Sequence, residues 1–286
     1  MHFGGDDVPE IYTLSENSKV VFIPCPYGNT TSYQSGTDKG PDAILDAANH
    51  MELFDEELKK EIFVHGVFTQ APMAVSDLSP EQMFQEVYEN IKNVLAKDKF
   101  PILLGGEHSV SPGVVKAVSE KYNNVSVLHL DAHYDLRNEY EGSKHSHACA
   151  ARRFLEYAPV VEVGVRSLCK DEYDFIKTKP DGLYIKDVYD ILKDKKWRED
   201  VVANLSDNVY ISLDLDVFDP SIMPSTGTPE PGGLTWDQIR SLIKIVSEKK
   251  NIVGFDVVEL MPIDDLKAPD FMTAKLIYRI MGYVFG

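Results

Sequence analysis

The sequence contains few cysteines, and their scarcity excludes a disulfide-stabilised fold. Three cysteines, Cys25, Cys149 and Cys169, lie far apart in a chain of 286 residues and form no CxxC pair. An odd number of isolated cysteines is typical of reduced thiols in a cytoplasmic protein and disfavours a thiolate zinc site. A chain of this length can bury a substantial core without disulfides.

Long apolar segments and an excess of positive charge are also missing. No run of about 18 apolar residues occurs, so no transmembrane helix is expected, and the N-terminal segment MHFGGDDVPE lacks the features of a signal peptide. Acidic residues outnumber basic ones by 46 to 29, which gives a formal net charge of −17. This charge excludes a general nucleic-acid binder and favours encounter with cationic small molecules, although solubility alone would also explain it. We therefore expect a cytoplasmic protein without a nucleic-acid or membrane partner.

Short apolar runs alternate with amphipathic stretches along the chain. The runs are rich in β-branched residues and almost continuously apolar, as expected for strands buried on both faces. They are 19–24, 101–104, 125–130, 160–165, 209–213 and 252–258, with 183–185 as a shorter candidate. Helical periodicity covers 80–96, 112–122, 146–157, 171–177, 197–205, 235–248 and 268–281, and Thr235 is a candidate N-cap. The alternation predicts one α/β domain over residues 1–286, with a parallel sheet and helices on both faces.

Ionisable residues follow four of the predicted strands. In an open α/β sheet, ligands bind outside the carboxyl ends of the strands. The segments found there are 105–109 (GGEHS), 131–135 (DAHYD), 214–216 (DLD) and Glu259. Any one of these residues alone would more often be a helix cap or a solvated loop residue. Their occurrence at four strand ends indicates a functional site.

The spacing within two of these segments is typical of metal ligands. Asp131, His133 and Asp135 alternate along an extended chain, so their side chains project to the same side. Asp214 and Asp216 repeat this spacing after another apolar strand. Grouping such residues without a cation would cost electrostatic repulsion and desolvation.

His108, which follows two glycines, completes a set of two histidines and four aspartates. Four carboxylates balance the charge of two divalent cations. An oxygen-rich ligand set with some imidazole favours manganese over zinc. Two metal ions about 3.5–4 Å apart can activate a bridging water at neutral pH. The sequence therefore predicts two Mn²⁺ per chain and a hydrolytic reaction.

Taken in order, these segments resemble the metal-binding signature of the ureohydrolase (arginase/agmatinase) family. The similarity also covers 28–33, 40–41, 218–221, 227–235 and 256–259, and so extends over nearly the whole chain. The resemblance implies an arginase-like three-layer α/β/α fold with a parallel, roughly eight-stranded sheet. It also implies a Mn²⁺ pair, assembly into homo-oligomers such as trimers or hexamers, and release of urea from a guanidinium compound.

The resemblance also implies roles for individual residues. The positions that match family metal ligands are His108, Asp131, His133, Asp135, Asp214 and Asp216. Among them, Asp135 and Asp214 are candidates for shared contacts to both ions. Glu259 matches the glutamate that pairs with the guanidinium group, and Thr228 matches a further contact on the guanidinium side.

His147 matches the active-site histidine of the family, in preference to its neighbour His145. Its expected role is to shuttle protons between the site and bulk water, helped by an unperturbed pKa near 6.5, and it would also contact the substrate. In the implied mechanism a metal-bridging hydroxide attacks the guanidinium carbon. Asp135 then relays the hydroxide proton toward the leaving amine.

Three segments bear on which guanidine is cleaved. Arginases hold the α-carboxylate and α-amino groups of their substrate with polar residues in the loop after DAHxD. Here that loop, 136–142 (LRNEYEG), departs from the arginase pattern. Together with 146–153 (SHACAARR) and 227–233 (GTPEPGG), it resembles the agmatinase branch.

Agmatine, a dication without a carboxylate, is accordingly the expected substrate, with putrescine and urea as products. An acidic rim formed by Glu139, Glu141 and Glu230 would suit it. Arg137 leaves an acid such as guanidinobutyrate open, and N1-aminopropylagmatine and L-arginine also remain open. Two readings outside the ureohydrolases are a regulatory protein that has lost catalysis and a metal-dependent deacetylase of related architecture.

Overall fold

Eight parallel strands form the central sheet of the computed structural model, which describes residues 1–286. In spatial order they are β4 (Val67–Thr69), β1 (Val20–Cys25), β5 (Phe100–Gly105), β10 (Asn251–Val258), β9 (Asn208–Asp214), β6 (Val125–Leu130), β7 (Val160–Val163) and β8 (Leu183–Lys186). The observed sheet confirms the predicted parallel, roughly eight-stranded architecture. Its longest strands lie near the middle, where both faces are covered by helices.

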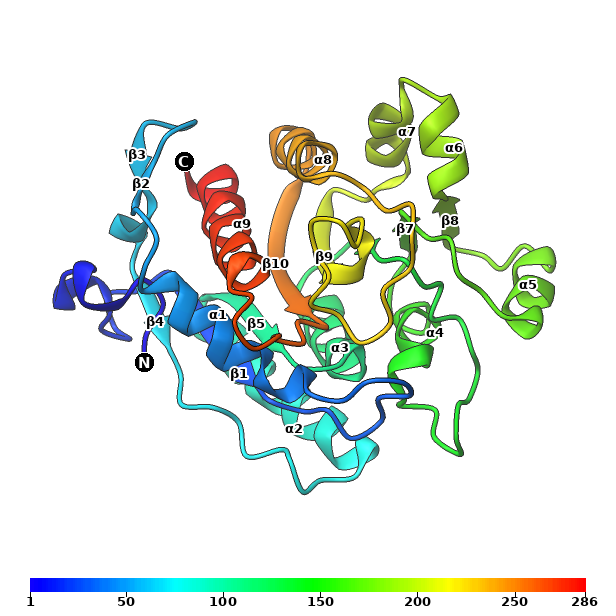
Figure 1. Cartoon of the computed structure of the whole chain (residues 1–286), viewed down its shortest axis with the longest axis horizontal. Helices are drawn as coiled ribbons and strands as arrows, with labels where there is room; N and C mark the ends of the chain where they lie inside the picture. The colour runs from blue at the N-terminus through cyan, green and yellow to red at the C-terminus, as the bar shows by residue number, and fades with distance from the viewer.

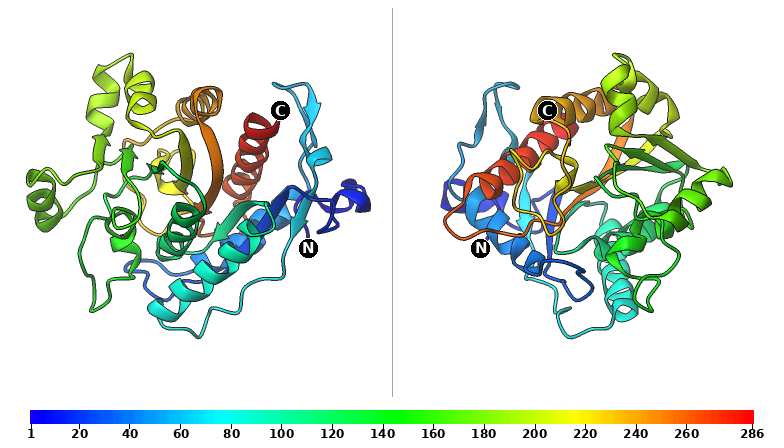
Figure 2. Two further views of the ribbon diagram at one scale, coloured as in Figure 1. Left: turned by 180° about the vertical axis from the view of Figure 1, so that it is seen from behind. Right: turned by 45° about the vertical axis from the view of Figure 1, so that its right-hand side comes forward.

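Helices cover the sheet on two sides (Figures 1 and 2). One layer contains α1 (Gly40–Ala48), α7 (Trp197–Asn204), α8 (Trp236–Lys249) and α9 (Ala268–Phe285). The other contains α2 (Pro80–Leu95), α3 (Ser111–Lys121) and α4 (Ala150–Phe154). The smaller elements are α5 (Lys170–Lys177), α6 (Val188–Lys193) and an antiparallel pair, β2 (Phe54–Asp55) and β3 (Lys60–Glu61). None of the helices combines the length and apolar character needed to cross a membrane.

Alternating side chains of each strand serve the two layers. In β1, Val20 and Phe22 pack in the core beneath α1 and α9, whereas Val21 and Ile23 pack against α2 and α3. Successive strand side chains point to opposite faces, so a continuous apolar run is needed to fill both cores. Complete burial of one such side chain stabilises the fold by roughly 1.5–3 kcal/mol.

Two helix starts follow from their sequences. Thr235 caps α8, because its hydroxyl accepts the N–H of Gln238 while the Gln238 side chain accepts the N–H of Thr235. This confirms the predicted N-cap. Ser79 and Gln82 form the same reciprocal pair at the start of α2.

Some helices and strands differ from the sequence prediction in their bounds or were not predicted. The helix expected over 146–157 is divided into a 3₁₀ turn, His147–Cys149, and the short α4. The division occurs at Cys149, whose backbone, with φ −121° and ψ 4°, lies outside the α-helical region. No sequence pattern predicted β4, α1 or α6. β4 has only three residues, and α1 begins with Gly40 and Pro41, which weaken a helical pattern.

Candidate metal centre and active site

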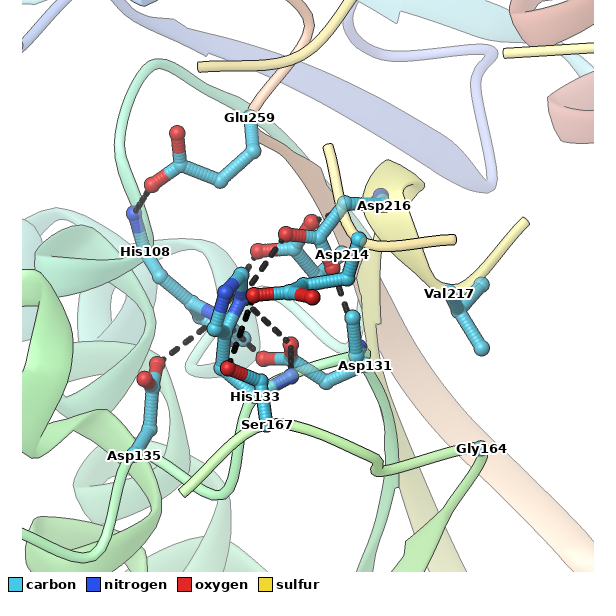
Figure 3. A network of polar contacts seen from close by, with 12 residues as sticks. His108, Asp131, His133, Asp135, Gly164, Ser167, Asp214, Asp216, Val217 and Glu259 are labelled. Carbon is cyan, nitrogen blue, oxygen red and sulfur yellow. Dashed lines mark hydrogen bonds and ion pairs between the residues drawn. The ribbon is translucent and has the colours of Figure 1, made fainter. Parts of the chain in front are cut away.

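The four strands predicted to carry site residues are neighbours at the centre of the sheet. β5, β10, β9 and β6 follow one another in the strand order, and all run parallel. Their carboxyl ends therefore meet at one edge, and the segments after them converge. Figure 3 shows the labelled aspartates gathered around the imidazole rings of His108 and His133.

A buried ring nitrogen of His108 points at three carboxylates. Its Nδ1 lies 3.1 Å from Asp131 Oδ2, 3.4 Å from Asp135 Oδ2 and 3.2 Å from Asp214 Oδ2. The side chain is 1% exposed, and Nδ1 has no hydrogen-bond partner within the chain. A buried nitrogen without a partner, surrounded by oxygens, is the environment of a metal ligand.

The other ring nitrogen of His108 is fixed from behind. Nε2 lies 3.0 Å from Ser212 Oγ, and Ser212 donates its hydroxyl proton to Asp256 over 2.9 Å. Tyr210 donates to the second oxygen of Asp256 over 2.7 Å. Because the Ser212 proton is directed at Asp256, Ser212 accepts from Nε2–H, and Nδ1 keeps a lone pair. A lone pair facing carboxylates is repulsive unless a cation or a proton lies between them, so these residues fit a metal ion.

A second group of candidate ligands centres on His133. Its Nδ1 lies 2.9 Å from Asp216 Oδ2 and 3.6 Å from Asp131 Oδ1. Asp131 therefore belongs both to this group and to the group around His108. Two adjoining groups of ligands that share one carboxylate suit two neighbouring cations. The shared contacts predicted for Asp135 and Asp214 stay predictions.

The electrostatics of the aspartates also favour bound cations. Burial and the nearby carboxylate of Asp131 raise the pKa of Asp135 well above its ordinary value. Burial together with Asp216 does the same to the pKa of Asp214. For Asp131, burial is outweighed by the nearby imidazoles of His108, His129 and His133, which hold its pKa well below the ordinary value. Buried carboxylates this close together cannot all ionise without a compensating positive charge.

A cavity of about 200 Å³ opens above this cluster. Its lining includes eight of the nine predicted site residues: His108, His133, Asp135, His147, Asp214, Asp216, Thr228 and Glu259. Asp131, the ninth, is fully buried among its histidine and aspartate neighbours. Asp135 and Glu259 have positive φ angles of 48° and 65°. Such conformations cost roughly 1–3 kcal/mol and gather at functional sites.

The structure distinguishes His147 from its neighbour His145. His147 lines the cavity, whereas the ring of His145 packs against Phe84 with 4.7 Å between ring centroids. Burial, followed by the nearby imidazoles of His133 and His108, lowers the pKa of His147 to about 4. The expectation of an unperturbed value near 6.5 is therefore wrong, and His147 is a neutral imidazole at pH 7 because its ring is largely buried.

Glu259 lies apart from the cluster of aspartates (Figure 3) and is partly fixed. Its Oε1 accepts the backbone N–H of His108 over 2.7 Å (Figure 3). Burial and the neighbouring Glu107 carboxylate raise its pKa to about 8. Removing water and adding like charge both favour the neutral acid, and a bound cation would reverse this preference.

The mouth of the cavity is formed partly by residues of the loop after DAHYD. Arg137 and Tyr140 line the mouth, and the Arg137 guanidinium lies 4.9 Å from the centre of the Tyr140 ring. Glu139 and Glu141 are exposed and do not line the cavity. Glu230 accepts a hydrogen bond from Ser167 Oγ over 2.9 Å. Of the expected acidic rim, only the Glu230 carboxylate forms a hydrogen bond with a cavity-lining side chain.

Two buried residues behind the site escaped the sequence analysis. His129 Nε2 lies 2.9 Å from Asp131 Oδ2, and His129 Nδ1 lies 4.0 Å from Glu162 Oε1. Both oxygens of the fully buried Glu162 lack a hydrogen-bond partner, and burial raises its pKa well above the ordinary value. Each of these residues lies inside an otherwise apolar strand, so one ionisable residue in an apolar run was the only sequence signal.

Arg166 was also missed, although it holds the loop over the site. Its Nη2 donates to the carbonyl oxygens of Asp216 over 2.8 Å and Glu230 over 2.7 Å, and its Nε donates to Pro231 O over 3.1 Å. The fork of guanidinium donors thus ties the loop after β9 to the end of that strand. An arginine three residues after the buried strand β7 was the only sequence signal.

The fold and this site define an α/β protein with a histidine and aspartate cluster suited to metal ions. The family model described as "Arginase family" matches residues 18–285 of the chain. The chain therefore belongs to the arginase family. It is accordingly an enzyme of the ureohydrolase type, as the sequence predicted. A match of this extent favours a ureohydrolase over a related deacetylase.

Three known proteins illustrate the similarity. The N(1)-aminopropylagmatine ureohydrolase of Synechocystis sp. is 36% identical over 282 residues, which are 96% of this chain and 92% of that protein. The agmatinase of Bacillus cereus is 34% identical over 276 residues, covering 94% and 93% of the two chains. The crystal structure of agmatine ureohydrolase of Thermoplasma volcanium superimposes with a TM-score of 0.88 at 31% identity, over 99% of this chain and 94% of the other.

Proposed function

We propose that this protein is an agmatinase that hydrolyses agmatine to putrescine and urea with the help of two Mn²⁺ ions. One observation carries the proposal: the partnerless Nδ1 of His108 and its three carboxylate neighbours lie beneath a cavity that also exposes Glu259 and His147. The two groups of ligands supply a place for a cation pair, and the Glu259 carboxylate supplies a partner for a guanidinium group.

The proposed metal ligands are those that match the family pattern. They are His108, Asp131, His133, Asp135, Asp214 and Asp216. Four carboxylates and two imidazoles suit Mn²⁺ better than Zn²⁺. When bound, two such ions lower the pKa of a water molecule and stabilise the negative charge that develops during hydrolysis.

Glu259 is proposed to orient the substrate. One of its oxygens is held by the His108 N–H, which fixes the carboxylate and leaves the other oxygen to the guanidinium group. This free oxygen can accept a charge-assisted hydrogen bond from a guanidinium N–H group, which would orient the guanidinium group in the cavity. Thr228, which lines the same cavity, is proposed to contact the guanidinium side of the substrate.

Asp135 and His147 are proposed to move protons. Asp135 lines the cavity next to the other aspartates, where its carboxylate can accept a proton from the attacking water. It then passes this proton to the leaving amine as the C–N bond breaks. His147 is neutral and can accept a proton on the cavity side and return it to bulk water.

The preference for agmatine is supported by charge. The chain carries a formal net charge of −17, which attracts a dication by long-range electrostatics. N1-aminopropylagmatine is the second candidate, because the similar relatives carry both names at nearly equal identity. Arg137 at the cavity mouth would favour a carboxylate-bearing guanidine such as guanidinobutyrate, and L-arginine completes the set to be compared.

A parallel substrate comparison tests the proposal. The purified protein, reconstituted with Mn²⁺, is assayed for urea release from agmatine, N1-aminopropylagmatine, 4-guanidinobutyrate and L-arginine. The highest kcat/KM with agmatine is expected. A higher value with another guanidine would move the assignment to that substrate and to the 137–142 loop, and no urea from any of them would refute the proposed reaction.

We further propose a cytoplasmic homo-oligomer, a trimer or hexamer, without a nucleic-acid or membrane partner. The acidic composition and the three isolated cysteines support the location and the absence of nucleic acid. The state of assembly rests on the family resemblance. Size-exclusion chromatography with light scattering tests it, and a monomeric mass of 32.2 kDa would contradict it.

A further inference from the structure

A buried chain of hydrogen bonds leads from Glu107 to His147. Glu107 follows β5, and Thr30 lies in the loop after the neighbouring strand β1. The fully buried Glu107 carboxylate accepts the Thr30 N–H over 2.7 Å and the Thr30 hydroxyl over 2.6 Å. Thr30 Oγ1 in turn lies 3.2 Å from His147 Nδ1. Glu107 and Thr30 belong to two segments of the family pattern, but neither has a role in the proposed mechanism.

The donors and acceptors of this chain fix the position of one proton. Glu107 also accepts from Ser109 Oγ over 2.5 Å, so its oxygens are surrounded by donors. The single hydroxyl proton of Thr30 is directed at Glu107, and Thr30 Oγ1 can then only accept from His147. It accepts the His147 backbone N–H over 3.1 Å. A hydrogen bond between the His147 ring and Thr30 Oγ1 therefore requires a proton on Nδ1, which leaves the lone pair of the imidazole on Nε2.

We propose that Thr30, held by Glu107, is a positioning residue that keeps His147 in the Nδ1–H form with Nε2 as its proton acceptor. This inference rests on the proposed function, because it assigns a partner to the proton shuttle of that reaction. The Tyr140 ring supports the same orientation, since it meets the His147 ring edge to face at 5.8 Å between centroids. The two contacts fix both the plane of the imidazole and its tautomer.

The contact to Thr30 persists when His147 is protonated. When Nε2 takes up a proton, the imidazolium keeps donating from Nδ1 to Thr30. The hydrogen bond from Thr30 to Glu107 stays in place, and no proton is transferred to Glu107. Release of the Nε2 proton to water restores the starting state. A histidine without this support would rotate or adopt the other tautomer, with its lone pair directed away from the reaction.

The substitution Thr30→Val removes the hydroxyl group of Thr30 and little else. Valine has nearly the shape of threonine, and its backbone N–H still donates to Glu107. We expect kcat to fall by about 10- to 100-fold, a part of the roughly 10²- to 10⁴-fold that a positioned acid–base group contributes. KM and Mn²⁺ content are expected to stay within about twofold, because no substrate or metal contact is removed. Thr30→Ser keeps the hydroxyl and should recover most of the activity.

Two comparisons separate positioning from general damage. Thr31→Val is the matched control, since it removes a neighbouring hydroxyl that makes no hydrogen bond within the chain, and it should leave kcat unchanged. In a His147→Asn background, Thr30→Val should cause no further loss, because the residue it positions is already gone. An equal loss in both backgrounds would overturn the proposal. Ser146→Ala tests the rival hydroxyl, 3.3 Å from His147 Nδ1, and a larger effect there than at Thr30 would also overturn it.

The tautomer can be measured without any reaction. In metal-free protein labelled with ¹⁵N-histidine, nitrogen chemical shifts distinguish the two neutral forms, and the His147 signals are identified by their loss in His147→Asn. We expect Nδ1–H in the native protein and a shift toward Nε2–H in Thr30→Val. An Nε2–H form in the native protein would refute the proposal. If no guanidine yields urea, the proposed function fails, but this measurement still decides the inference.

Discussion

Replacing Glu259 with glutamine tests how the guanidinium group is held. The Glu259 oxygen that accepts the His108 N–H at 2.7 Å must become the amide oxygen, because only an acceptor can occupy that position. The amide nitrogen then faces the cavity, where a guanidinium group offers only donors. The loss of one charge-assisted hydrogen bond costs about 1.5–3 kcal/mol. The amide and guanidinium donors that then face each other without an acceptor cost about 1–3 kcal/mol more. The total is at least about 2.5 kcal/mol, which corresponds to a roughly 70-fold fall in kcat/KM.

Steady-state urea release from agmatine provides the assay, with the Mn²⁺ content of each preparation measured in parallel. Glu139→Gln is the matched control, because Glu139 is exposed and does not line the cavity. The kcat/KM of this control should differ from that of the native enzyme by no more than about threefold. If Glu259→Gln with full metal content also kept a kcat/KM within about threefold of the native value, the contact assigned to Glu259 and the guanidinium group would be wrong.

Three further predictions concern the metal site, the loop and a buried acid. Chelation should lower the melting temperature, because a ligand at about 1,000 times its Kd stabilises the folded state by about 4 kcal/mol; equal melting curves with EDTA and with Mn²⁺ would argue against a cation site. Arg166→Lys should cost about 1–3 kcal/mol in a denaturant titration and expose the 219–233 loop to proteases, since lysine cannot span the three carbonyl groups. For Glu162, whose pKa is raised by burial, stability falls as pH rises above the unfolded value of about 4.3. In EDTA at pH 8, Glu162→Gln should therefore unfold at a higher denaturant concentration than the native protein. At pH 4 the two proteins should unfold at the same concentration. The same difference in unfolding midpoint at both pH values would contradict the raised pKa of Glu162.

The central part of the fold could be predicted because its signals are local. Continuous apolar runs marked seven of the eight strands, and the ionisable residues after four of them marked the site. Strand order could not be derived from these runs, yet the prediction did not depend on it. In a parallel sheet all carboxyl ends meet at one edge, so β5, β6, β9 and β10 bring their residues together in any neighbouring arrangement.

The missed features depend on contacts between distant segments. The hydrogen bonds from Thr30 to Glu107 exist because β1 pairs with β5, a fact of topology that neither segment reveals alone. The low pKa of His147 arises from burial beneath the assembled loops, and residue type gives only the unperturbed value. The interpretation of Glu139 and Glu141 as a cavity rim failed for the same reason, since loop conformation decides which side chains line the cavity.

Titration of metal-free protein with Mn²⁺, while urea release from agmatine is followed, tests the central claim most directly. The account predicts no urea without metal and a rise in activity that ends at two Mn²⁺ per chain. Asp131, shared by the two ligand groups, should be required for both ions, so Asp131→Asn should lose activity and bind fewer than two. Full urea release from protein stripped of metal, or two tightly bound Mn²⁺ without urea from any guanidine, would contradict the account.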